Sequence, residues 1–214
     1  MDELMQLKQR LESERPVVWD ELPDIALYMD QVISYMPRQI IRFDEGEQIT
    51  SAMVNNYIKD GVVPRADGKR YGRAHIGFLT AVCTMKKVLS VSQIKTLFDA
   101  VPDGSDPQVL YGYFTKALDQ ALNETDDALK LKDDETLARL ALGLALRSYA
   151  DQLACQQILA GLREREDAAE QEEKERKEQQ IKEKKEQEKE KKEQEKKEQK
   201  EKKAKEKQEK KEQA

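Results

Sequence analysis

The residues best suited to chemistry in this chain lie on one short amphipathic helix that begins after Thr50. Two adjacent amides, Asn55 and Asn56, fall on its polar side. An asparagine presents a donor and an acceptor side by side, which matches the edge of adenine in the major groove of duplex DNA. Because neighbouring residues stand about 100° apart on a helix, only one of the two can read a base. We expect Asn55 to read a base and Asn56 to meet a phosphate.

Cations cluster around this helix. Residues 49–73 contain five cations against two anions, a net charge of +3, whereas residues 1–162 hold 18 cations against 24 anions, so the rest of that region sums to −9. Phosphate contact is local, since the Debye length is about 8 Å at physiological salt. The cations expected to hold phosphates are Lys59, Arg65, Lys69, Arg70 and Arg73. The alternative is an ordinary solvated charged loop.

The helix N-terminus and the segment behind the helix complete this candidate site. Backbone N–H groups near Ser51 and Ala52 favour an approaching anion. Gly61 is expected to close the helix, and Pro64 prevents its continuation. The dipeptide Asp67-Gly68 tolerates the positive φ angles of a tight β-hairpin, here joining residues 62–65 to residues 69–71. Helix and basic hairpin together predict the recognition helix and wing of a winged helix-turn-helix.

The rest of the front part of the chain is patterned as helices. Apolar residues recur at helical spacing over 25–36, including Ile25 and Tyr28, and Pro37 ends that helix before a connection over 38–48. A mostly buried helix is expected over 73–88, and Ser90 with Gln93 predicts a capping box before a helix over 91–100. Further helices are expected after Asp106-Pro107 and over 134–162, and residues 2–14 form an amphipathic helix or a frayed end.

The helix over 134–162 carries two apolar rows. One row consists of Leu137, Ala141 and Leu144, and the other of Leu142, Leu146, Tyr149 and Leu153. One row can serve the chain's own core and leave the second for a homodimer contact. The alternative is a central helix that is buried within one subunit.

Composition changes near Gly161. Residues 163–214 are almost entirely Lys, Glu, Gln and Arg and repeat Glu-Lys-Lys-Glu-Gln. Without an apolar seam, a coiled coil is not expected there, and the choice lies between a solvated helix and a disordered spacer. We expect partial helix. The predicted organisation is an N-terminal segment 1–20, a DNA-binding domain 21–104, a helical dimerisation or regulatory region 105–162, and the tail 163–214.

Several classes of function lack the residues they need. Cys83 and Cys155 lie far apart in apolar helical patterns, which favours small buried hydrophobic residues over a disulfide. His75 is the only histidine, and no spacing typical of a metal site, a Gly-rich phosphate loop or a nucleophile is present. We therefore expect no enzyme, no cofactor and no metal. The absence of a membrane span or a signal peptide pattern predicts a cytoplasmic protein.

Four segments carry a family resemblance: Leu22–Val32, Ile49–Lys59, Lys69–Ile76 and Leu89–Lys95. Together they resemble the YkrK-type bacterial proteins, catalogued as domain-of-unknown-function family 1836, over roughly residues 20–160. The resemblance implies a DNA-binding transcription regulator with a helix-wing-helix region similar to that of the MerR class.

Particular positions follow from this resemblance. It places Thr50 at the helix cap, Val54 and Tyr57 at buried anchors, residues 61–64 at the turn into the wing and Tyr71 at its end. Asn55 and Asn56 depart from the pattern, because MerR proteins usually carry Arg and Tyr there. The connection 37–48 is also longer than usual, and Gly72 stands where the family usually caps with Ser.

The sequence thus predicts a mostly α fold: a MerR-like winged helix-turn-helix with a small β-hairpin wing, an α-helical bundle, and a charged tail. The expected function is sequence-specific binding of double-stranded DNA by a homodimeric transcriptional regulator, with helix 50–59 and wing 62–71 docking on the duplex. Helices between 106 and 162 would pair subunits or sense an effector. The alternative is a protein-interaction module with a charged spacer and no DNA binding.

Overall fold

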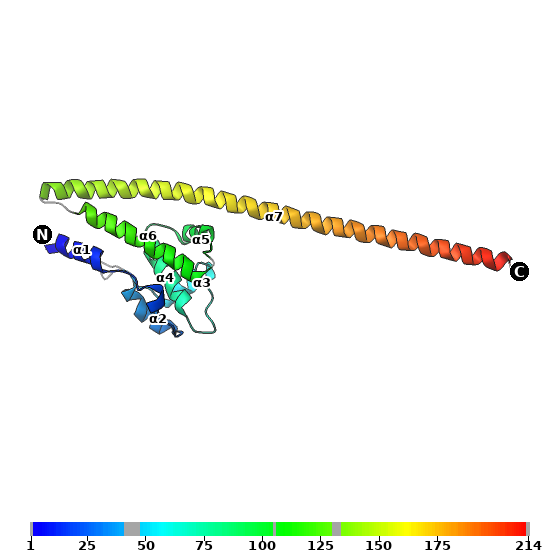
Figure 1. Ribbon diagram of the computed structural model, residues 1–214, viewed down its shortest axis with the longest axis horizontal. Coiled ribbons are helices and arrows are strands. Elements are labelled where there is room, and N and C mark those ends of the chain that lie inside the picture. Colours follow the sequence, from blue (N-terminus) through cyan, green and yellow to red (C-terminus); the bar gives the residue numbers. More distant parts are fainter. Residues whose placement is uncertain (1, 41–47, 105, 130–133, 213–214) are drawn as a thin grey trace. The chain divides into compact units, whose positions relative to one another are not determined.

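The computed structural model describes residues 2–40, 48–104, 106–129 and 134–212 (Figure 1). They divide into two units, Met1–Leu162 and Arg163–Ala214. In the first unit lie α1 (Asp2–Ser13), α2 (Met29–Tyr35), α3 (Ser51–Lys59), α4 (Arg73–Met85), α5 (Val91–Ala100), α6 (Pro107–Ala128) and the beginning of α7 (Asp134–Glu212), with 3-10 turns η1 (Trp19–Glu21) and η2 (Met36–Arg38). The central part of the connection predicted over 38–48 lies outside the described residues.

Helix α4 forms the middle of the core, in agreement with the mostly buried helix predicted over 73–88. Ile76, Leu79 and Val82 are fully buried in it, and the helix packs against α5 and α6. Val54 of α3 and Ile94 of α5 are equally inaccessible. A mostly α fold is therefore confirmed, with the core built around one apolar helix.

Capping residues begin the helices where the sequence predicts them. The Thr50 hydroxyl accepts a hydrogen bond from the N–H of Met53 at 3.3 Å. Ser90 and Gln93 cap each other's backbone N–H at 3.2 and 2.9 Å, which completes the predicted capping box. Asp106 accepts from the N–H of Gln108 at 2.8 Å. These bonds satisfy backbone donors that have no partner within a helix.

Helix α2 is shorter than the predicted helix over 25–36. Leu27 exchanges two backbone hydrogen bonds of 2.9 Å with Tyr71, so its peptide groups are not free to form a helical turn. The N–H of Tyr28 is instead capped by the side chain of Gln31 at 2.8 Å. Ile25 is consequently 68% exposed, although its spacing predicted a buried position.

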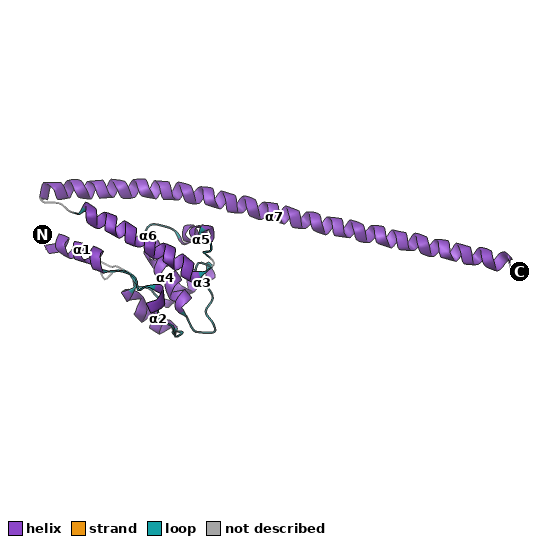
Figure 2. Cartoon of the chain, in the orientation of Figure 1, coloured by secondary structure: helices purple, strands orange, loops and turns teal. Residues whose placement is uncertain are grey.

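The predicted β-hairpin wing is wrong. Figure 2 shows helices and loops and no strand in the described part of the chain. Between the two arms of the predicted hairpin, the described residues keep one isolated pairing, between Asp67 and Arg70. The turn itself forms, with Gly68 at φ +61°. The strands fail because Val62 and Val63 are both buried, against the alternation of a strand, and both donate their N–H groups to the carbonyl of Tyr57.

Two further features remove the partners that a hairpin needs. Pro64 has no N–H to donate to a ladder. Tyr71, at the far end of the predicted wing, pairs with Leu27 instead of with the first arm of the hairpin. The fold therefore contains a tight turn with several cations, residues 65–72, which we call the basic turn. It is not a winged helix-turn-helix in the residues described.

A buried polar cluster joins three distant segments. The hydroxyl of Tyr111 in α6 donates to the carbonyl of Val17 at 2.7 Å, and the N–H of Val17 donates to Oε1 of Gln39 at 3.2 Å. Burial raises the pKa of the Tyr111 phenol well above its usual range. The cluster fastens the segment before η1 and the end of η2 to α6.

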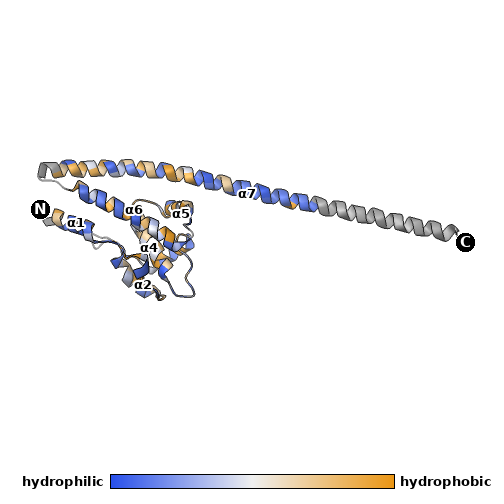
Figure 3. Cartoon of the chain, viewed as in Figure 1, coloured by the Kyte–Doolittle hydropathy of each residue, from blue (hydrophilic) through white to orange (hydrophobic). Residues whose placement is uncertain are grey.

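Helix α7 has one buried side in the first unit. Leu159 is 4% exposed, and Cys155 and Leu162 pack against the core. Neither Cys155 nor Cys83 forms a disulfide in the part of the chain that the structure describes. Figure 3 shows hydrophobic residues concentrated in the first part of α7.

Considered by itself, the second unit is helical up to Glu212, which exceeds the partial helix expected for the tail.

Candidate nucleic-acid interface

Helix α3 separates its buried and exposed residues cleanly. Val54 and Tyr57 are 0% and 4% exposed, and they fix the helix against the core. The predicted contact residues all lie on the solvent side, namely Ser51, Ala52, Asn55, Asn56 and Lys59. Gly61 then takes φ +74° and ends the helix, as predicted. The outer side of α3 is thus a short polar surface on a rigidly anchored helix.

The basic turn after α3 is held in shape by His75. The N–H of Gly72 donates to Nδ1 of His75 at 3.0 Å, so the ring proton lies on Nε2, which donates to the carbonyl of Arg65 at 3.1 Å. The imidazole also packs edge-on against Tyr71, with ring centroids 5.5 Å apart. One side chain at the start of α4 therefore contacts three positions of the segment 65–72.

Arg70 is positioned by a second aromatic residue. Its guanidinium donates to the hydroxyl of Tyr28 at 3.0 Å and lies 4.7 Å from the centre of that ring. Tyr28 immediately precedes α2 and is 46% exposed. Stacking on an aromatic face holds the arginine side chain without neutralising its charge. Arg65 and Lys69 are exposed on the same turn.

Arg73 lies apart from the other predicted phosphate contacts. It is only partly exposed, its guanidinium lies 6.0 Å from the ring of Trp19, and its Nε atom is buried with no hydrogen-bond partner in the part of the chain that the structure describes. This arginine is therefore directed toward the core of the unit. Four of the five predicted cations remain exposed.

The structure brings some of the predicted residues together and leaves others apart. Arg65 and Arg70 are linked through the turn that His75 and Tyr28 hold. No interaction among the described residues joins Asn55 or Asn56 to that turn. The outer side of α3 is held by the buried residues Val54 and Tyr57, and the basic turn is held by His75 and Tyr28. The role of Tyr28 was not predicted, because its spacing placed it in a buried row. The available signal was Gln31, three residues later, whose side chain can cap the N–H of Tyr28 where a helix begins.

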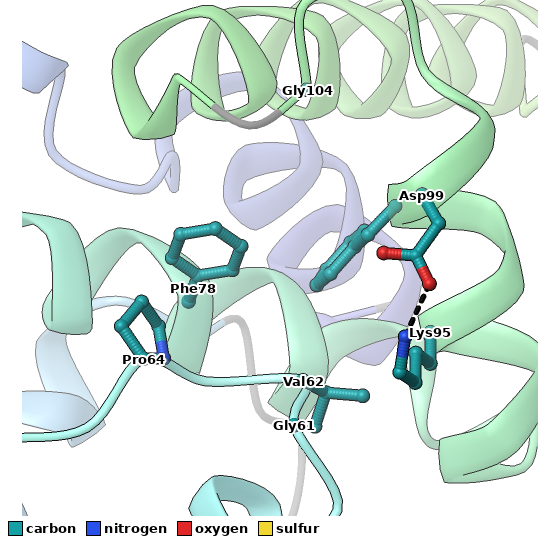
Figure 4. Close-up of a pocket in the computed structure, with 8 residues that line it drawn as sticks. Gly61, Val62, Pro64, Phe78, Lys95, Asp99 and Gly104 are labelled. Atoms are coloured by element: carbon teal, nitrogen blue, oxygen red, sulfur yellow. Dashed lines mark hydrogen bonds and ion pairs between the residues drawn. The ribbon is translucent and has the colours of Figure 1, made fainter. Parts of the chain in front are cut away.

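A small cavity lies behind the end of α3 (Figure 4). Its volume is about 290 Å³, and Val62, Pro64, Phe78 and Phe98 are among the residues that line it. The two phenylalanine rings pack edge to face at an interplanar angle of 67°, with centroids 5.6 Å apart. An ion pair between Lys95 and Asp99 closes one side. The cavity is thus lined by apolar side chains on one part and by the Lys95–Asp99 ion pair on another.

Two other kinds of site find no support in the described residues. No group of three or more His, Cys, Asp or Glu side chains in those ranges could hold a metal ion. Nor does any helix there combine the length and apolar character that crossing a membrane requires.

Comparison with known proteins identifies one domain. Residues 17–114 match the family model of a domain of unknown function, DUF1836. That segment runs from just before η1 into α6 and includes α3, the basic turn and α4. The match supports the domain-family part of the resemblance seen in the sequence. No curated protein and no solved structure matches the chain.

Proposed function

We propose that this protein is a sequence-specific DNA-binding transcriptional regulator, in which the outer side of α3 meets base edges and the basic turn meets the phosphate backbone. The observation that carries the proposal is the division of α3 itself. Val54 and Tyr57 are buried, whereas Asn55, Asn56 and Lys59 are exposed on a helix that is capped and closed at both ends.

The proposed roles follow from the chemistry of each side chain. Asn55 pairs with the donor and acceptor of an adenine edge, which discriminates between bases by about 1–3 kcal/mol. Lys59, Arg65, Lys69 and Arg70 contact phosphates, which sets the register of the protein on the duplex without reading sequence. Arg73 has no role here, because it packs toward Trp19.

The sequence resemblance supports the same function. The resemblance to the YkrK-type proteins, whose domain-family part the DUF1836 match supports, implies a regulator of this kind, here without the wing that the described residues lack. The proposal places the protein in the cytoplasm, with double-stranded DNA as its partner.

Binding of the full chain to genomic DNA fragments, measured by fluorescence anisotropy at several salt concentrations, tests the proposal. Four exposed cations predict a slope of log affinity against log salt of about −4 for each bound subunit. Lys69→Ala should weaken binding equally on all sequences and reduce the slope by about 1. Asn55→Ala should lower affinity only for the preferred sequence. Lys116→Ala, which removes an exposed cation from α6, is the matched control and should change nothing.

Binding without sequence preference that is also indifferent to Asn55→Ala and Lys69→Ala would contradict the proposal. A protein partner that stays bound through nuclease treatment and high salt, in the absence of DNA affinity, would favour the interaction module instead.

A further inference from the structure

A row of large apolar side chains on α7 lies in solvent. Leu142, Leu146, Tyr149 and Leu153 are 62%, 60%, 62% and 49% exposed. Single exposed apolar residues are common on protein surfaces, but a contiguous patch marks a contact with something else. This row is contiguous, because its spacings of four, three and four residues keep all four side chains on one side of a helix.

The row lies on the side of α7 that faces away from the core of its own unit. Leu159, Cys155 and Leu162 face the core, and at 3.6 residues per turn their direction differs from that of the row by about 150°. Gly143, beside the row, has open space around the position where a Cβ would stand. Of the two alternatives for this helix, the exposures favour a row that is available for a partner over a helix buried within one subunit.

The chemistry of the row limits the kind of partner. Four, three and four is the spacing of a heptad seam, in which two helices interlock side chains along their length. The flanking residues Ala145 and Ala150 are small and uncharged, so a second helix can approach closely. A partner must therefore present an uncharged apolar seam of equal length, and the same row on another copy of the chain does so.

We propose that this row, residues 142–153, is a homodimer interface in which α7 of one copy packs antiparallel against α7 of a second copy. Antiparallel pairing centred between Leu146 and Tyr149 places Leu142 opposite the partner's Leu153, so that leucines meet at both ends. It also places Arg139, the next seam position, opposite the partner's Gln156. Parallel pairing would set Arg139 against the same arginine of the other copy, and like charges there oppose association. The interface does not depend on whether the protein binds DNA.

The molar mass of the full chain in solution tests the interface. We expect twice 24.7 kDa at high micromolar concentration, from light scattering after size exclusion. Leu146→Glu should raise the dimer dissociation constant by roughly a thousandfold, since a buried leucine is lost from both copies and two carboxylates approach the seam. Ile158→Glu is the matched control: Ile158 is 63% exposed on a different side of α7, and its substitution should leave the dimer intact.

Cross-linking tests the orientation. In a Cys155→Ala background, with Cys83 buried, a short bismaleimide should join two copies of the double variant Leu142→Cys with Leu153→Cys but neither single variant. Efficient cross-linking of the single variants would overturn the antiparallel arrangement. A chain that stays monomeric at high micromolar concentration, or a dimer that tolerates Leu146→Glu with unchanged helix content, would overturn the interface. None of these outcomes depends on a measurement of DNA affinity, so failure of the interface can be told apart from failure of the proposed function.

Discussion

Replacing His75 with alanine should loosen the basic turn while leaving the fold in place. The substitution removes the bond that Nδ1 accepts from Gly72, the bond that Nε2 donates to the carbonyl of Arg65, and the edge-on contact with Tyr71. Hydrogen bonds of this kind contribute about 0.5–1.5 kcal/mol each, and an aromatic pair adds about 0.5–1.5 kcal/mol. The ring is only partly buried, so we expect a total loss of about 1–3 kcal/mol in the free energy of unfolding.

Urea denaturation, followed by far-UV circular dichroism, measures this loss. His75→Gln is the informative companion variant, because Gln at the third helical position can still accept from the N–H of the N-cap residue. It should recover the bond to Gly72 but neither the bond to Arg65 nor the ring contact, and so fall between wild type and alanine. The urea concentration at the midpoint of unfolding should fall, while the slope of the unfolding free energy against urea concentration stays constant.

The result that refutes this reasoning is equal stability of wild type, His75→Gln and His75→Ala to within about 0.5 kcal/mol, which is the usual range for an unimportant surface position. If His75→Ala is instead as destabilising as a large core truncation, the histidine supports more than the turn, and the assignment of its three contacts is incomplete.

Three further predictions concern stability. Thr50→Ala should lower the free energy of unfolding by about 1 kcal/mol through loss of the α3 cap, and Thr50→Ser should not. Tyr111→Phe should lower the free energy of unfolding by about 1 kcal/mol. Because burial raises the pKa of Tyr111, the stabilisation from its neutral phenol is fully present below pH 10.0 and is lost as pH rises above that value, so wild-type stability should fall more steeply than that of the variant. Urea titrations at several pH values measure the difference. Gly104→Ala should cost about 1–3 kcal/mol, because its Cβ would stand 2.8 and 2.9 Å from two backbone carbonyl oxygens; thermal unfolding should show no loss for Gly112→Ala, whose Cβ meets nothing.

Local signals in the sequence predicted the helices well. Thr50, Ser90 and Asp106 act within four residues of themselves, and the apolar spacing of α4 is decided by its own sequence. The exposed side of α3 was predictable too, because Val54 and Tyr57 must face the core and this directs the polar residues outward. The Asp67-Gly68 turn was also predictable, because its backbone angles depend on the two residues alone.

Long-range pairing was not predictable from such signals. The partner of Tyr71 is Leu27, which is 44 positions earlier in the sequence, and this pairing both shortens α2 and removes the predicted hairpin. Arg73 was indistinguishable from the other cations until Trp19 was found beside it. In each case the competing contact comes from the segment before α2, and the residues around Tyr71 and Arg73 carry no local signal for it.

The Tyr111 cluster determines where this protein can be cut. A fragment that stopped before α6 would remove the phenol and leave the carbonyl of Val17 without its donor, while a fragment that began at η1 would take away Val17 itself, and with it one of the donors to Oε1 of Gln39. Either truncation leaves polar atoms without partners inside an apolar interior, so expression trials that trim the chain to α3 and α4 should yield insoluble material unless both ends of the cluster are retained.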